Sequence, residues 1–177
     1  MVIDLNIDIM KIESSSTKGN FIIKNGSLNI LELKYENWFS SKARTNYNKD
    51  EISIKPQNIW CSKFDIYKND KDVGDIISNW QGNIIIRNSF KGEIEKSYLL
   101  KAKGFWKHKF ELIDESENLI FVMEPKMSST SGYDYKIETA NNTLNEDQFI
   151  ELLIYCGFGA NLYMAMMSAG MAGFVAT

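Results

Sequence analysis

Hydrophobic and polar residues alternate along most of the chain before residue 140. At the start, Ile3, Leu5, Ile7 and Ile9 are separated by aspartate and asparagine residues. A period of two is typical of a strand with one buried face. The next residues, 13–20, are rich in serine and predict a loop.

A hairpin follows this loop, and the strand pattern becomes dense from about residue 51. Residues 21–24 and 28–35 flank Asn25-Gly26, which favours a hairpin turn because both residues tolerate positive φ. Residues 38–50 are polar and predict an irregular connection. Roughly ten to twelve strand candidates fit the alternating pattern, and evenly spaced short strands indicate an antiparallel sandwich or barrel. The later candidates are residues 59–67, 73–80, 83–87, 93–103, 105–114, 119–124 and 133–139.

The last part of the chain has a different pattern. Thr143 and Glu146 have the spacing of a helix capping box, and Asn145 is a second N-cap candidate. After Glu151 no charged residue occurs up to Thr177. This pattern predicts a helix over about residues 145–170 that is apolar on every side, and such a helix lies either in a bilayer or inside a protein.

Two locations for this helix follow from the sequence. The apolar run exceeds the ~20 residues that a membrane span needs, but no Lys or Arg lies beside it to anchor a span, and Asn161 interrupts it. Alternatively, a barrel of more than about eight strands leaves a lumen that something must fill. We therefore expect a mainly β fold: one domain over residues 1–177, in which a closed antiparallel barrel of about twelve strands (residues 1–140) surrounds a buried C-terminal helix. Residues 170–177 would run past the barrel.

Composition narrows the class of protein. A chain of 177 residues fits one domain of ordinary size. Its net charge of −3 argues against general nucleic-acid binding, which depends on clustered Lys and Arg. Two distant cysteines, Cys61 and Cys156, form no disulfide framework, and the N-terminus does not resemble a signal peptide. These features predict a cytoplasmic location.

The residues that carry catalytic or metal chemistry are sparse. His108 is the one histidine, so a site with two imidazole ligands cannot form within one chain. No nucleophile motif surrounds it, and Gly157-x-Gly159 lacks the preceding strand of a dinucleotide site. We therefore predict no enzymatic activity, no cofactor and no metal.

One dense basic cluster occurs together with aromatic residues. Its basic residues could attract an anionic lipid surface, at ~1 kcal/mol each, and tryptophan suits the membrane interface. Alternatively, the alternating lysines form the wet face of a strand while Phe110 packs inward. A Met-rich stretch that includes Met164, Met166 and Met167 allows an adaptable binding face or irregular core packing. The candidate lipid-binding residues are Lys101, Lys103, Trp106, Lys107, His108 and Lys109.

Several segments resemble the tubby C-terminal-like, phospholipid-scramblase-related and LURP-one-related proteins. The likeness lies in Lys63-Phe64-Asp65-Ile66-Tyr67, in residues 73–80, in the long hairpin of residues 104–114 and 119–126, and in residues 133–138 followed by the terminal helix. It covers about residues 55–177. The sequence lacks a Pro-rich N-terminal region, a cluster of cysteines for palmitoylation and an acidic Ca²⁺ segment before the helix.

This resemblance implies a twelve-stranded barrel around a central helix, in a family whose members bind phosphoinositides or move phospholipids between leaflets. We expect a non-enzymatic module that binds anionic phospholipid at a membrane surface. The alternatives are a soluble domain that binds a protein partner without lipid preference, and a membrane-inserted scramblase-like protein. The sequence leaves the oligomeric state open.

Overall fold

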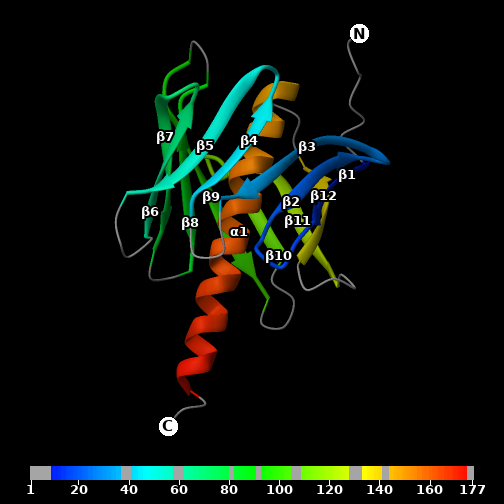
Figure 1. Ribbon diagram of the computed structural model, residues 1–177, viewed down its shortest axis with the longest axis vertical. Coiled ribbons are helices and arrows are strands. Elements are labelled where there is room, and N and C mark those ends of the chain that lie inside the picture. Colours follow the sequence, from blue (N-terminus) through cyan, green and yellow to red (C-terminus); the bar gives the residue numbers. More distant parts are fainter. Residues whose placement is uncertain are drawn as a thin grey trace.

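The computed structural model describes residues 9–36, 41–57, 62–79, 82–90, 93–104, 109–127, 133–140 and 144–174. These residues form twelve antiparallel strands and one helix, α1 (Glu146–Phe174) (Figure 1). The strands are β1 (Met10–Ser14), β2 (Phe21–Asn25), β3 (Leu28–Tyr35), β4 (Ala43–Tyr47), β5 (Asp50–Pro56), β6 (Lys63–Lys68), β7 (Lys71–Ser78), β8 (Ile84–Asn88), β9 (Lys96–Lys103), β10 (Lys109–Ile113), β11 (Leu119–Met127) and β12 (Tyr133–Thr139).

Each strand pairs with its neighbours in the sequence, and β1 pairs with β12 to close the barrel. Left-handed turn residues help to reverse the chain between strands: Gly26 follows β2, and Asn69 and Asp70 join β6 to β7 with φ values of 50° and 61°. Asparagine, aspartate and glycine tolerate this conformation better than other residues. The expected mainly β, closed barrel of about twelve strands is therefore confirmed.

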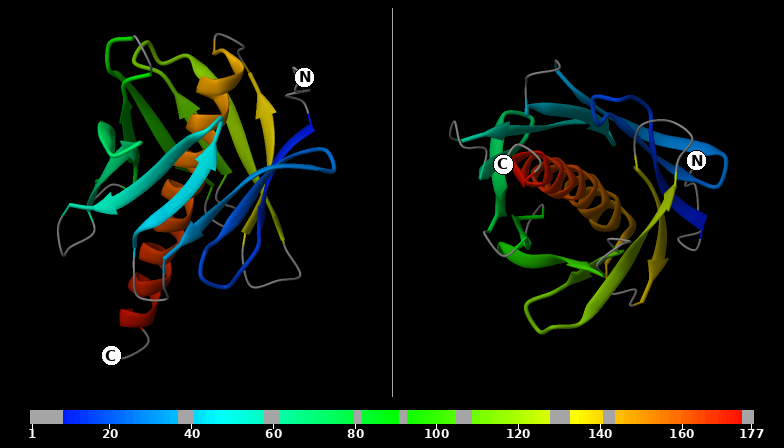
Figure 2. Two further views of the ribbon diagram at one scale, coloured as in Figure 1. Left: turned by 45° about the horizontal axis from the view of Figure 1, so that its top comes forward. Right: turned by 90° about the horizontal axis from the view of Figure 1, so that it is seen from below.

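Helix α1 fills the lumen of the barrel (Figure 2). In most strands a buried residue alternates with a more exposed one, as in β8, where Ile84 and Ile86 are buried and Ile85 is only partly so. Aromatic pairs tie the helix to strands on different sides of the barrel. Phe158 lies edge-on to Phe64 at 5.0 Å between ring centroids, and Phe149 contacts Phe121 at 5.5 Å. The lumen that twelve strands enclose is thus occupied, as the pattern predicted.

The helix start agrees with one of its two predicted caps. Because α1 begins at Glu146, Asn145 is the N-cap residue, and Thr143 of the predicted capping box lies outside the described residues. Asn145 Oδ1 accepts from the backbone N–H of Gln148 at 3.0 Å, and Gln148 Oε1 accepts from the N–H of Asn145 at 3.2 Å. This reciprocal pair satisfies two backbone donors that the helix itself leaves unbonded.

Two further predictions need correction. Residues 38–50 were expected to be irregular, but β4 lies within them, because Ala43 and Thr45 point inward between polar residues. The Ser-rich loop expected at residues 13–20 starts later, since β1 continues to Ser14. Most of the expected first strand, residues 3–9, lies outside the described residues.

Candidate functional site

Helix α1 enters the barrel at one rim and leaves at the other. At the second rim, Asn161 Nδ2 donates to the carbonyl of Gly19 at 2.8 Å, and Ser78 Oγ donates to Met166 Sδ at 3.2 Å. The ring of Tyr163 lies so close to Gly82 that a Cβ there would be 3.0 Å from it. Asn161, which interrupts the apolar run, therefore has a partner on the barrel.

Beyond these contacts the helix projects from the barrel (Figures 1 and 2). Tyr163 is 9% exposed, whereas Met166 and Met167 are 43% and 41% exposed. The helical backbone continues to Phe174, and no charged residue occurs after Glu151. The helix end is therefore apolar and uncharged, and the barrel covers Met166 and Met167 only in part, with Met166 Sδ still bonded to Ser78.

The rim around this helix end is basic. We define the exit rim as the turns at this end together with the two strand residues next to each turn. Among its described residues, nine are basic: Lys18, Lys34, Lys42, Arg44, Lys55, Lys63, Lys103, Lys109 and Lys126. Three are acidic: Glu13, Glu36 and Asp134. The described exit rim therefore carries a large positive excess in a protein whose net charge is −3.

The opposite rim, defined in the same way with the first turns of α1 added, is acidic, and we call it the entry rim. Its described basic residues are Lys11, Lys24, Lys49, Lys68, Lys71, Arg87 and Lys96. Its described acidic residues number thirteen: Asp50, Glu51, Asp70, Asp72, Glu93, Glu95, Asp114, Glu115, Glu117, Glu138, Glu146, Asp147 and Glu151. The two ends of the barrel therefore carry opposite charge, and the apolar helix end emerges from the basic one.

The predicted lipid-binding cluster lies partly on the outer wall beside the exit rim. Lys103 faces Lys109 across β9 and β10, and Lys101 faces Glu111. Phe110 points inward and is buried, as the strand-face interpretation of this cluster predicted. Lys109 forms an ion pair of 3.3 Å with Glu124.

The other members of the predicted cluster, Trp106, Lys107 and His108, lie outside the described residues. Among the described residues, neither Lys103 nor Lys126 has an acidic partner within ion-pair distance, and both are exposed. These two lysines are therefore the part of the described exit rim most available to an anionic surface.

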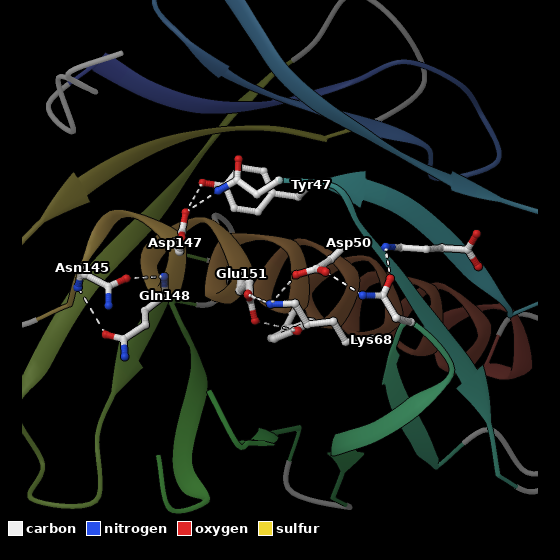
Figure 3. A network of polar contacts seen from close by, with 11 residues as sticks. Tyr47, Asp50, Lys68, Asn145, Asp147, Gln148 and Glu151 are labelled. Atoms are coloured by element: carbon white, nitrogen blue, oxygen red, sulfur yellow. Dashed lines mark hydrogen bonds and ion pairs between the residues drawn. The ribbon is translucent and has the colours of Figure 1, made fainter. Parts of the chain in front are cut away.

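At the entry rim a buried polar network fixes the helix (Figure 3). Glu151 is 4% exposed, and its carboxylate accepts from Lys68 Nζ at 2.5 Å and from the Tyr155 hydroxyl at 3.4 Å. Lys68 also pairs with Asp50 at 3.2 Å. Burial disfavours the charge on Lys68, but the hydrogen bonds and attraction of Glu151 and Asp50 outweigh this effect and raise its pKa.

Further bonds hold the first turn of α1 (Figure 3). Asp147 Oδ1 accepts from the Tyr47 hydroxyl at 3.0 Å and from Asn48 Nδ2 at 2.5 Å. These two hydrogen bonds join the β4–β5 hairpin to the start of the helix. Gln148 Nε2 donates to Glu93 at 2.5 Å. The two helix ends therefore differ: one is bonded to the barrel, and the other projects from it.

The described residues offer neither an exposed cysteine nor a cluster of metal ligands. Cys156 is fully buried, which raises the pKa of its thiol well above the usual value and disfavours a thiolate. No cluster of three or more His, Cys, Asp or Glu residues in the described part of the chain could hold a metal ion. Cys61 lies outside that part.

A cavity of about 250 Å³ lies at the entry rim, beside Tyr98, Asp114 and Glu115. Its carboxylates already bond the chain: Asp114 accepts from Asn118, and Glu115 accepts from the N–H of Ser97. Burial and the neighbouring carboxylates raise the pKa of Tyr98 to about 12, so its hydroxyl stays protonated near neutral pH. These polar groups mainly shape turns and strand ends, so the exit rim is the stronger candidate site.

The separation of charge between the rims could not be found from the sequence alone. Acidic and basic residues alternate along the chain, and they separate only when the strand ends are assigned to rims.

Comparison with protein-family models, curated proteins and solved structures gives no match to this chain.

Proposed function

We propose that this protein is a non-enzymatic module that binds anionic phospholipid at a membrane surface through the exit rim and the projecting end of α1. The observation that carries this proposal is the coincidence of two features at one end of the molecule. An uncharged helix end emerges there with Met166 and Met167 exposed, and the rim around it is basic.

The electrostatic contribution comes from the exit rim. A basic residue near an anionic membrane surface contributes about 1 kcal/mol, and this attraction falls off within a Debye length of ~10 Å at 0.1 M salt. Lys103 and Lys126 are exposed at this rim. The acidic entry rim faces the opposite way, so the same field would orient the molecule with the helix end toward the membrane.

The apolar contribution comes from the helix end. Fully burying a methionine side chain contributes about 1.5–3 kcal/mol. Residues 164–174 of α1 extend about 16 Å at ~1.5 Å per residue, which is close to half of the ~30 Å hydrocarbon core. The length suits shallow insertion of the helix end. The same helix is long and apolar enough to cross a membrane, but two thirds of its most apolar stretch is buried inside the barrel.

Vesicle flotation of the protein, purified without detergent, tests this proposal. We expect binding to vesicles that contain phosphatidylserine, little binding to pure phosphatidylcholine, and a decrease at high salt. The variant Lys103→Glu/Lys126→Glu should bind the anionic vesicles at least tenfold more weakly, because each change replaces an attraction of ~1 kcal/mol with a repulsion.

A matched variant controls for net charge. Lys49→Glu/Lys71→Glu makes the same charge change with exposed lysines of the entry rim, and we expect it to bind as the wild type does. Equal losses in both variants would contradict the proposed orientation. Absence of wild-type binding to any vesicle would reject lipid binding and favour a protein partner.

A further inference from the structure

Four methionines of the described residues differ sharply in exposure. Met10 and Met123 are 1% and 0% exposed in the barrel core. Met166 and Met167, on the projecting end of α1, are 43% and 41% exposed. The same residue type is therefore protected in the core and accessible to solvent at the exit rim.

Exposure determines how readily a thioether is oxidised by a peroxide. The sulfur attacks one peroxide oxygen, an S–O bond forms as the O–O bond breaks, and the remaining oxygen leaves as water after proton transfer. The sulfur loses two electrons and the peroxide gains them. The product, methionine sulfoxide, is polar where the thioether was apolar, and methionine sulfoxide reductases reverse the change with a thiol as reductant.

We propose that Met166 and Met167 form a peroxide-sensitive modification site whose oxidation releases the protein from anionic membranes. This inference rests on the proposed function, because these side chains are the described apolar part of the membrane-binding end. Two sulfoxides there remove the apolar gain of insertion, while the basic rim keeps its attraction. Oxidised protein is therefore expected to lose the apolar part of its membrane affinity and to become more sensitive to salt.

The barrel should survive this modification. Met166 and Met167 lie beyond Tyr163, the last described helix residue that is buried. Their oxidation leaves the packing of Met10 and Met123 intact. Loss of membrane binding without loss of the fold distinguishes this site from general oxidative damage.

The experiment treats the full chain with dilute hydrogen peroxide, maps added oxygen by peptide mass spectrometry, and measures flotation with phosphatidylserine vesicles before and after treatment. We expect Met166 and Met167 to gain oxygen well before Met10 and Met123, with an unchanged circular dichroism spectrum. Binding should fall at least tenfold and return after treatment with methionine sulfoxide reductase and dithiothreitol.

The variant Met166→Leu/Met167→Leu is the matched control for oxidation, since it keeps an apolar surface but cannot form sulfoxide. Its binding is compared with its own binding before treatment, whatever the starting affinity, and we expect peroxide to leave that binding unchanged. If peroxide oxidises Met166 and Met167 but leaves binding intact, the switch is wrong and the proposed function stands. If the Leu variant also loses binding after treatment, another residue is responsible. If untreated wild type does not bind, the proposed function and this inference both fail.

Discussion

The buried carboxylate of Glu151 is the last charge of the chain before the apolar run, and its environment explains how a charge enters the barrel. An ion in a protein interior is tolerated when it is paired and hydrogen-bonded. Lys68 and Tyr155 supply both, and Asp50 holds Lys68 from the solvent side. This chain of contacts joins the β5–β6 side of the barrel to the second turn of α1.

Removing one member of this pair should be costly. Lys68→Met leaves the Glu151 carboxylate buried with only the Tyr155 hydroxyl among its described partners, and breaking a buried pair costs about 3–5 kcal/mol. Since Lys68 is partly exposed, we expect a loss at the lower end of this range, about 3 kcal/mol of unfolding free energy. Urea denaturation measures it. The control Lys71→Met, on the exposed lysine that directly follows the β6–β7 turn, should change stability by less than about 0.5 kcal/mol.

The double variant Lys68→Met/Glu151→Leu separates pairing from packing. If the cost of the single variant comes from an unpaired buried charge, removing that charge should recover most of the lost stability. A double variant that is less stable than Lys68→Met would show that Glu151 stabilises the barrel through its other contacts.

At the scale of the element, glycines in α1 serve close packing rather than flexibility. A Cβ on Gly157 would lie 2.6 Å from Cζ of Phe21, and one on Gly159 would lie 2.9 Å from Cγ2 of Ile84. Phe21 and Ile84 are buried strand residues. The helix therefore approaches β2 and β8 more closely than a helix with larger residues at these positions could.

This packing reverses the usual effect of replacing a helical glycine. In an exposed helix Gly→Ala stabilises by about 1 kcal/mol, but Gly157→Ala forces the new methyl group into the Phe21 ring. We expect a net loss of about 1–3 kcal/mol, the usual cost of overpacking, measured by thermal or urea unfolding. Adding Phe21→Leu should recover part of it, and an unchanged or higher stability of Gly157→Ala alone would contradict the close contact.

The elements differ in how clearly the sequence shows them. Hairpins with turn residues were predicted well: Asn25-Gly26 and Asn69-Asp70 lie at the expected turns. Strand β4 was missed because its inward residues, Ala43 and Thr45, are small or polar, so hydrophobic alternation does not mark them. The helix start was ambiguous because Thr143 and Asn145 both suit an N-cap, and only the reciprocal bonds with Gln148 decide between them.

At the scale of the whole molecule, the closed barrel could be predicted from two features together. A helix that is apolar on every side must be buried, and a barrel of more than about eight strands leaves a lumen for it to fill. The basic exit rim could be predicted only in part. Lys103 and Lys109 are close in sequence and belong to the predicted cluster, whereas Lys18 and Lys126 join the same rim only through the strand order. The likeness to tubby-like proteins implied a barrel around a central helix, which the structure has. Membership of that family stays a prediction.

Because the proposed membrane contact involves only the projecting part of α1, truncation should separate stability from membrane binding. A chain that ends at Ser168 keeps every described buried residue of the helix, including Phe158 and Tyr163. We expect its unfolding free energy to stay within about 0.5 kcal/mol of the full chain. Its binding to phosphatidylserine vesicles should weaken, because the apolar helix end is shorter.

A chain that ends at Tyr155 is the contrasting variant, since it empties part of the lumen. Loss of a large buried side chain such as Phe158 costs about 3–5 kcal/mol, against a total stability of about 5–15 kcal/mol for a typical domain. We therefore expect this variant not to fold, by circular dichroism and urea denaturation. If the chain ending at Ser168 also unfolds, the projecting turns stabilise the barrel, and their apolar surface is needed for folding whether or not it binds a membrane.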